Sequence, residues 1–115
     1  MKVTIWHNPK CATSRKVLDL IRARGHEIDI VDYVAHAPSE ADILAVLDEA
    51  DIKPRDLLRR RGTPYDALGL DEPGITDSAL IAAMHAHPIL IERPVVRTKK
   101  GTRLARPPEL VLEIL

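Results

Sequence analysis

The amino-acid sequence predicts an α/β fold, one domain built on a mixed β-sheet. Three observations predict this class. The chain opens with a strand, a helix and a second strand; it continues with helical segments; and it closes with short strands, a tight turn and a last helix. Its 115 residues, 45% of them apolar, suit one globular domain. We therefore expect a single domain over residues 1–115, with a helical insertion at about residues 39–87.

The first third of the chain is a predicted β-α-β unit. Residues 2–7 alternate polar and apolar side chains, and the Asn-Pro step that follows ends this strand. Apolar residues at helical spacing predict a helix from Thr13, with Gly25 suited to its C-terminus. Residues 28–34 form the second predicted strand, and a parallel pairing of the two strands requires a right-handed crossover.

The middle of the chain is predicted to be helical. Ser39 can cap one helix, Pro54 suits the first position of a short helix, and Thr76 can cap a third after the turn-rich residues 64–74. These helices make up the insertion.

Three further strands and a last helix are expected near the C-terminus. The strands cover residues 89–91, 95–98 and 102–105, and the turn between the last two requires antiparallel pairing. The Pro-Pro step at 107–108 begins the helix. The sheet is then mixed, with four to five strands, and this order of elements is that of a thioredoxin-like fold.

Cysteine usage and charge limit the function classes. A single cysteine excludes an internal disulfide and is typical of a reducing compartment, so we expect a cytoplasmic protein. No apolar run is long enough for a membrane helix, and a formal net charge of zero argues against broad nucleic-acid binding. We therefore expect neither a membrane nor a nucleic-acid partner.

The charges are unevenly distributed along the chain. Residues 27–51 contain eight acidic residues and no Lys or Arg, whereas residues 93–106 contain six basic residues and no acid. A small anion is the partner we expect for the basic segment. The alternative is two solvated faces of opposite charge.

The only thiol lies between a strand end and a helix start. At a helix N-terminus the free N–H groups and the helix dipole favour an anion, and Lys10, Arg15 and His7 can add positive potential. We therefore predict that Cys11 is unusually acidic and reactive. The alternative is a small buried apolar residue.

The residues after the thiol restrict its chemistry. Ser14 stands where a C-x-x-C motif has its resolving cysteine, so a disulfide step needs a thiol from another molecule. Val17 stands where the phosphate loop of a low-molecular-weight phosphatase needs arginine. His85 and His87 lack companion ligands in sequence, so no metal site is expected.

Arginines form the second group of candidate residues. Guanidinium groups bind tetrahedral oxyanions through paired hydrogen bonds. In a thioredoxin-like topology the residue before the third strand's proline lies beside the cysteine loop, which predicts Arg93 at the reacting centre and a cis Arg93–Pro94 bond. Arg103 and Arg106 follow on the last strand and its exit. Of residues 59–61, all arginine, we expect at least two to be solvated.

The sequence resembles the glutaredoxin-coupled arsenate reductases over almost its whole length, and its short ending is similar to that of an arsenate reductase-like subgroup. The shared motifs are His7-Asn-Pro-x-Cys11-x-x-Ser14-Arg15, Leu57-Leu58-Arg59, Pro64-Tyr65, Leu68-Gly69-Leu70, His87-Pro-Ile-Leu-Ile-x-Arg93-Pro94 and Gly101-Thr-Arg-Leu-x-Arg106-Pro107.

The resemblance implies reduction of arsenate to arsenite through a Cys11–arsenic adduct. The external reductants would be glutathione, which acts as a co-substrate, and glutaredoxin. The resemblance implies no tightly bound cofactor. The implied catalytic residues are Cys11, His7 and Ser14, and His7 helps lower the thiol pKa. The implied arsenate-binding residues are Arg59, Arg93, Arg106 and Arg15. Ser14 and Arg15 also support the cysteine loop.

Two other functions stay open from the sequence. One is a glutathione-dependent thiol oxidoreductase with another substrate. The other is a regulatory binding protein, because a transcription regulator that contacts RNA polymerase is similar in fold and sequence. That regulator carries C-x-x-C, and Ser14 in the second position disfavours it here.

Overall fold

The computed structural model describes residues 1–115, which divide into two compact units. The first unit joins the two ends of the chain, Met1–His36 and Arg93–Leu115. The second unit is continuous, Ala37–Glu92, and contains the predicted helical insertion. No helix is both long and apolar enough to cross a membrane.

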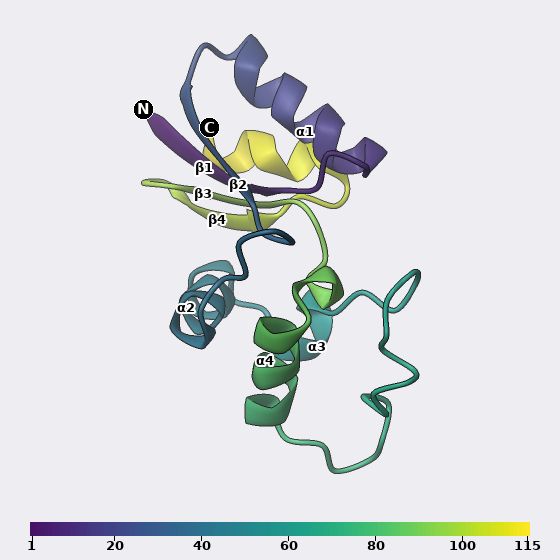
Figure 1. The fold of residues 1–115 in the computed structure, drawn as a ribbon. Coiled ribbons are helices and arrows are strands. Elements are labelled where there is room, and N and C mark those ends of the chain that lie inside the picture. The colour runs from purple at the N-terminus through teal and green to yellow at the C-terminus, as the bar shows by residue number, and fades with distance from the viewer. The chain divides into compact units, whose positions relative to one another are not determined.

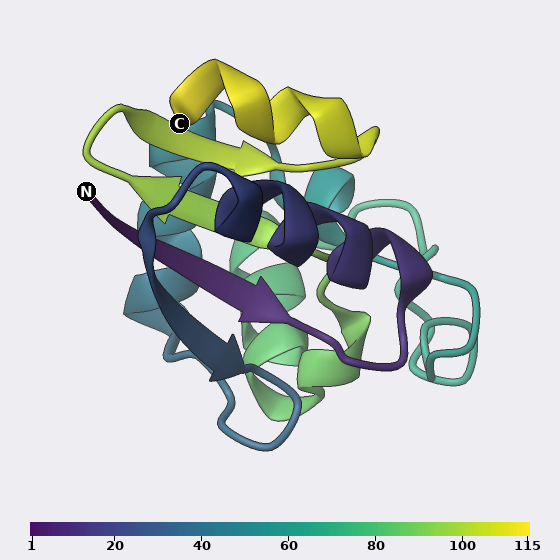
Figure 2. The same cartoon turned by 90° about the horizontal axis from the view of Figure 1, so that it is seen from above.

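The first unit contains a mixed four-stranded sheet (Figures 1 and 2). Its strands are β1 (Lys2–His7), β2 (Glu27–Asp32), β3 (Val95–Thr98) and β4 (Gly101–Leu104), in the order β2-β1-β3-β4. Strand β1 pairs with β2 in parallel and with β3 in antiparallel, and β3 pairs with β4 in antiparallel. This confirms a mixed α/β arrangement with four strands.

Two helical elements, α1 (Ala12–Ala23) and η2 (Pro108–Ile114), cover one face of this sheet (Figures 1 and 2). They pack on each other, and η2 also packs on β4. The expected last helix is therefore present, as a 3-10 helix. The buried core of this layer consists of Val3, Ile5, Val17, Leu18, Ile21, Val96, Ala105, Val111 and Ile114.

The second unit is helical, as expected. It contains α2 (Glu40–Ala50), α3 (Pro54–Leu57), α4 (Asp77–Ala86) and the 3-10 helix η1 (Pro88–Leu90). Helix α4 packs on each of the other three. The predicted caps are present, because the side chains of Ser39 and Thr76 accept hydrogen bonds from the first turns of α2 and α4.

The predicted strand at residues 89–91 is wrong. Pro88 begins the 3-10 turn η1, in which the N–H of Leu90 donates to the carbonyl of His87 and that of Ile91 to the carbonyl of Pro88. Ile91 takes part only in an isolated bridge with Leu58. A short apolar run predicts burial without distinguishing strand from helix, and Leu90 and Ile91 are indeed fully buried.

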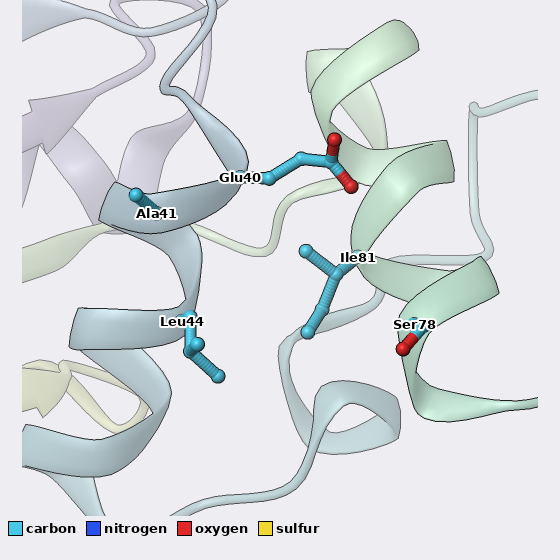
Figure 3. Close-up of a pocket in the computed structure, with 5 residues that line it drawn as sticks. All are labelled: Glu40, Ala41, Leu44, Ser78 and Ile81. Carbon is cyan, nitrogen blue, oxygen red and sulfur yellow. The ribbon is translucent and has the colours of Figure 1, made fainter.

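An open pocket of about 240 Å³ lies between α2 and α4 (Figure 3). Its lining contains one carboxylate and one hydroxyl, and no cysteine, histidine or arginine; the residues are Glu40, Ala41, Leu44, Ser78 and Ile81. The predicted reactive residues are therefore not part of this pocket.

Candidate active site

A tight loop between β1 and α1 carries the thiol. Asn8 is buried and builds this loop: its carbonyl accepts from the N–H of Cys11 at 3.0 Å, and its side-chain oxygen accepts from the N–H of Lys10 at 3.0 Å. The N–H of Asn8 donates to the Ser14 hydroxyl at 3.1 Å. These bonds bring Cys11 to the start of the helix.

Cys11 occupies the N-cap position of α1 and is half-buried. Partial burial by itself raises the pKa of its thiol. Three hydrogen bonds lower it, from the N–H of Ser14, the Arg93 side chain and the N–H of Thr13, and the charge of Arg93 lowers it as well. Together they outweigh the effect of burial, so the pKa lies below that of a free thiol. The geometry therefore favours a thiolate.

Two arginines from the C-terminal segment meet the thiol. Arg93 hydrogen-bonds to it through its side chain, and the Nε and Nη1 atoms of Arg93 are buried. The Nη1 atom of Arg106 lies 3.9 Å from the Cys11 sulfur and donates to the carbonyl of Arg93 at 3.1 Å. The Arg93–Pro94 bond is cis, as expected, and the Arg106–Pro107 bond is cis as well. Two positive charges thus converge on one sulfur.

His7 and Ser14 lie behind the loop. The Nδ1 atom of His7 and the Ser14 hydroxyl share a hydrogen bond of 2.6 Å, and both side chains are buried. Burial lowers the pKa of His7; Asp32 raises it, while Arg22 and Arg15 lower it further. The ring is therefore neutral at neutral pH, so it supports Ser14 rather than adding positive charge.

Two further arginines of the first unit, Arg15 and Arg103, have structural contacts of their own. Arg15 donates from Nη1 to the carbonyl of Pro9 at 2.8 Å, which ties α1 to the cysteine loop. Arg103 pairs with Glu113 on η2 at 3.2 Å, so it takes part in packing the C-terminal segment.

Arg59 belongs to the second unit, so its role toward the thiol stays a prediction. Its Nη1 atom donates to Glu92 at 3.1 Å and its Nε atom to the carbonyl of Arg61 at 3.0 Å. Arg60 pairs with Asp66 and lies 5.1 Å above the Tyr65 ring.

His85 and His87, for which no metal site was expected, lie in the second unit. The Nδ1 atom of His85 donates to the carbonyl of Pro38 at 2.7 Å, because a carbonyl can only accept. No group of three or more potential ligands among His, Cys, Asp and Glu is close enough to hold a metal ion.

Two residues that contact candidate site residues within their own units, Asn8 and Glu92, had no assigned role in the sequence analysis. Asn8 marked only the end of a strand, although an Asn before a Pro and a thiol is a typical loop-building residue. Glu92 was the unassigned position before Arg93, and nothing in the sequence indicates that it pairs with a residue 33 positions away.

Comparisons with known proteins agree on one family. A model described as the ArsC family matches residues 6–114. The arsenate reductase of Rhizobium meliloti strain 1021 is 48% identical over 115 residues, 100% of this chain and 82% of the relative. That of Escherichia coli strain K12 is 48% identical over 113 residues, 98% of this chain and 80% of the relative.

The solved structures include a similar protein. The structure of an arsenate reductase from Vibrio cholerae matches with a TM-score of 0.95 and 39% identity, covering 100% of this chain and 98% of that chain. This likeness confirms the predicted thioredoxin-like α/β fold. The chain therefore belongs to the ArsC family.

Proposed function

We propose that the protein reduces arsenate to arsenite through a Cys11–arsenic adduct, with glutathione and glutaredoxin as external reductants. The observation that carries this proposal is the acidic thiol at the N-terminus of α1 between the guanidinium groups of Arg93 and Arg106. The names of the similar proteins support arsenate as the substrate, because each of them is an arsenate reductase.

The proposed reaction uses one internal and two external thiols. The Cys11 thiolate attacks arsenic(V), an S–As bond forms and an As–OH group, once protonated, leaves as water. The glutathione thiol then binds the cysteine-bound arsenic, and a second water leaves. The glutaredoxin thiolate attacks the glutathione sulfur, and the bond between that sulfur and arsenic breaks. The electron pair of this bond reduces arsenic(V) to arsenic(III), while Cys11 stays bound to the arsenic. Hydrolysis releases arsenite and restores Cys11, and the two external thiols end as one mixed disulfide.

The chain's own groups act before and during the first step. The N–H groups of Thr13 and Ser14 and the charge of Arg93 lower the pKa of Cys11 and so favour the thiolate, which is the attacking species. Arg93 and Arg106 then bind the oxyanion that the thiolate attacks, and we propose that Arg59 joins them. Fixed guanidinium groups stabilise the charge that develops on the arsenic-bound oxygens.

The decisive experiment is a coupled assay of arsenate-dependent NADPH consumption with glutathione, glutaredoxin and glutathione reductase. We expect turnover by the wild type, none by Cys11→Ser, and none when glutathione or glutaredoxin is left out. Arsenite should form in step with NADPH loss. Glutathione oxidation without arsenite would instead indicate an oxidoreductase with another substrate, and no thiol chemistry at all would leave a regulatory binding protein.

The arginines provide a sharper prediction in the same assay. Arg93→Ala and Arg106→Ala should each lower turnover by roughly 100- to 1,000-fold, the usual effect of removing one preorganised donor to a developing oxyanion. Arg59→Ala should do the same, because Arg59 is the third arginine of the proposed oxyanion site.

Arg61→Ala is the matched control for this series, because its side chain is exposed and its neighbour Arg59 contacts only its carbonyl. Its rate should stay within about threefold of the wild type. Arg60→Ala is a poorer control, since Arg60 pairs with Asp66. Equal, small effects at positions 59, 61, 93 and 106 would show that these arginines form an ordinary basic surface.

A further inference from the structure

We propose that Glu92 is a positioning residue that fixes the guanidinium group of Arg59 for oxyanion binding. The proposal rests on the proposed function, in which Arg59 binds the substrate. It assigns a role to an acidic residue directly before Arg93, a place in the chain where a negative charge by itself would oppose an anionic substrate.

The backbone places these two side chains on the same face. Leu58 and Ile91 form an antiparallel bridge. Across it the N–H of Arg59 donates to the carbonyl of Leu90 and the N–H of Glu92 to the carbonyl of Leu57, both at 2.7 Å. In this register Arg59 and Glu92 are diagonal neighbours on one face, within reach of long side chains.

The guanidinium group is held on two of its edges. Nη1 donates to the Glu92 carboxylate at 3.1 Å and Nε donates to the carbonyl of Arg61 at 3.0 Å. The Arg59 and Glu92 side chains are only 20% and 19% exposed, so the pair is better shielded from solvent than a surface ion pair. These two bonds use the Nη1 and Nε atoms of Arg59.

The backbone around Arg59 is fixed as well. The hydroxyl of Thr63 donates to the carbonyl of Arg59 at 2.8 Å, and Leu57 and Leu90 on either side of the bridge are fully buried. With the backbone anchored, the remaining freedom is in the long side chain, and the carboxylate removes it. A preorganised arginine loses less side-chain entropy when it binds an anion.

Two variants of Glu92 separate the effect of its hydrogen bond to Arg59 from the effect of its negative charge. Glu92→Gln keeps an oxygen that accepts from Nη1 and removes the negative charge. Glu92→Ala removes both. Glu72→Ala is the matched control, because Glu72 is an exposed residue of the same unit whose hydrogen bonds, to the carbonyl of Gly69 and from the N–H of Ile75, are made by its backbone.

The first measurement is the exchange with water of the Arg59 Nη hydrogens, which include those that face Glu92, by 15N–1H NMR of the whole protein. It should be slow in the wild type, Glu92→Gln and Glu72→Ala, and fast in Glu92→Ala. Equal exchange in the wild type and Glu92→Ala would overturn the proposal, because Glu92 would then not hold the side chain.

The second measurement is the arsenate concentration that half-protects Cys11 from iodoacetamide. Glu92→Ala should raise it roughly tenfold, the effect of losing one charge-assisted hydrogen bond, and Glu92→Gln should stay within about threefold. In an Arg59→Ala background Glu92→Ala should add nothing, whereas a general loss of folding would add to the first effect.

The outcomes distinguish this inference from the proposed function. An additive double variant, or a wild type that arsenate does not protect, overturns the positioning role. Arsenate protection that depends on Glu92 through Arg59, without arsenate-dependent NADPH consumption, would support the positioning role and overturn the proposed reaction.

Discussion

At the residue scale, the state of the Cys11 thiol depends on its immediate neighbours. Burial by itself opposes a charged sulfur, and two backbone N–H groups and one guanidinium group reverse that preference. Arg106 approaches from the other end of the chain and adds a second positive charge at 3.9 Å. These groups lower the pKa of Cys11 and favour the thiolate.

The rate of Cys11 alkylation by iodoacetamide against pH should therefore have a midpoint below the free thiol value of about 8.5. Arg93→Ala should raise this midpoint, because it removes both a hydrogen bond and a charge from the thiolate. Arg61→Ala should leave it in place. A wild-type midpoint at or above the free value would contradict an activated nucleophile.

His7 predicts a pH dependence of stability. Its pKa in the folded protein lies below 6.5, so the unfolded chain binds the proton more readily. The stabilisation from neutral His7 is thus complete above the unfolded value of about 6.5 and declines as the pH falls from there toward the folded pKa.

Urea unfolding of the wild type and His7→Asn at several pH values between 5 and 8 measures this effect. The Asn amide can keep the hydrogen bond to Ser14 but does not titrate in this range. The free energy of unfolding of the wild type should fall more steeply below about pH 6.5 than that of the variant. Parallel curves would show that His7 does not titrate differently on folding.

At the scale of elements, the starts of α1, α2 and α4 are of two kinds. Helices α2 and α4 begin with Ser39 and Thr76, whose side chains accept a backbone N–H of the first turn. Helix α1 begins with Cys11, has no such side-chain cap and has no acidic residue in its first turn. Its free N–H groups therefore face the sulfur, which turns an ordinary helix start into a site for negative charge.

Replacement of the cap of α2 should affect stability and not chemistry. Ser39→Ala removes the acceptor for the N–H of Asp42, which lies at 3.0 Å, and should lower the free energy of unfolding by about 1 kcal/mol. Ser78→Ala, an exposed serine inside the first turn of α4, should change it by less than about 0.5 kcal/mol. Equal values from urea unfolding would contradict the capping role.

At the scale of the whole molecule, the first unit is assembled from both ends of the chain. Its core combines Val3 and Ile5 of β1 with Val96 of β3 and with Val111 and Ile114 of η2. The cysteine loop leaves β1, and Arg93 and Arg106 flank the β3–β4 hairpin. The packing of the C-terminal segment thus brings the arginines to the thiol.

Two neighbouring residues of η2 test this packing. Ile114 is fully buried and lies beside Gly101, whereas Leu112 is 38% exposed. Ile114→Ala should lower the free energy of unfolding by roughly 2–5 kcal/mol, since it leaves a cavity in the core. Leu112→Ala should cost less than about 1 kcal/mol. Similar losses for both variants in urea unfolding would contradict the observed orientation of η2.

The local elements could be predicted because short-range chemistry determines them. Ser39, Pro54 and Thr76 mark helix starts through backbone N–H groups and fixed φ angles within a few residues. The strand at residues 2–7 followed from alternation alone. The prediction at residues 89–91 was wrong because the apolar run there carries only the signal for burial, and Pro88 with its neighbours turns the backbone into η1.

The sequence by itself determined the thiol at a helix start, the absence of a second cysteine and the supply of arginines, because each is a property of residue type and local spacing. Only the tertiary structure decided which charged groups meet: Arg106 at the sulfur of Cys11, 95 positions away, and Glu92 at Arg59, 33 positions away. The reason is that such pairs depend on strand register and on the packing of buried side chains, and these bring together segments whose distance along the chain carries no signal of contact.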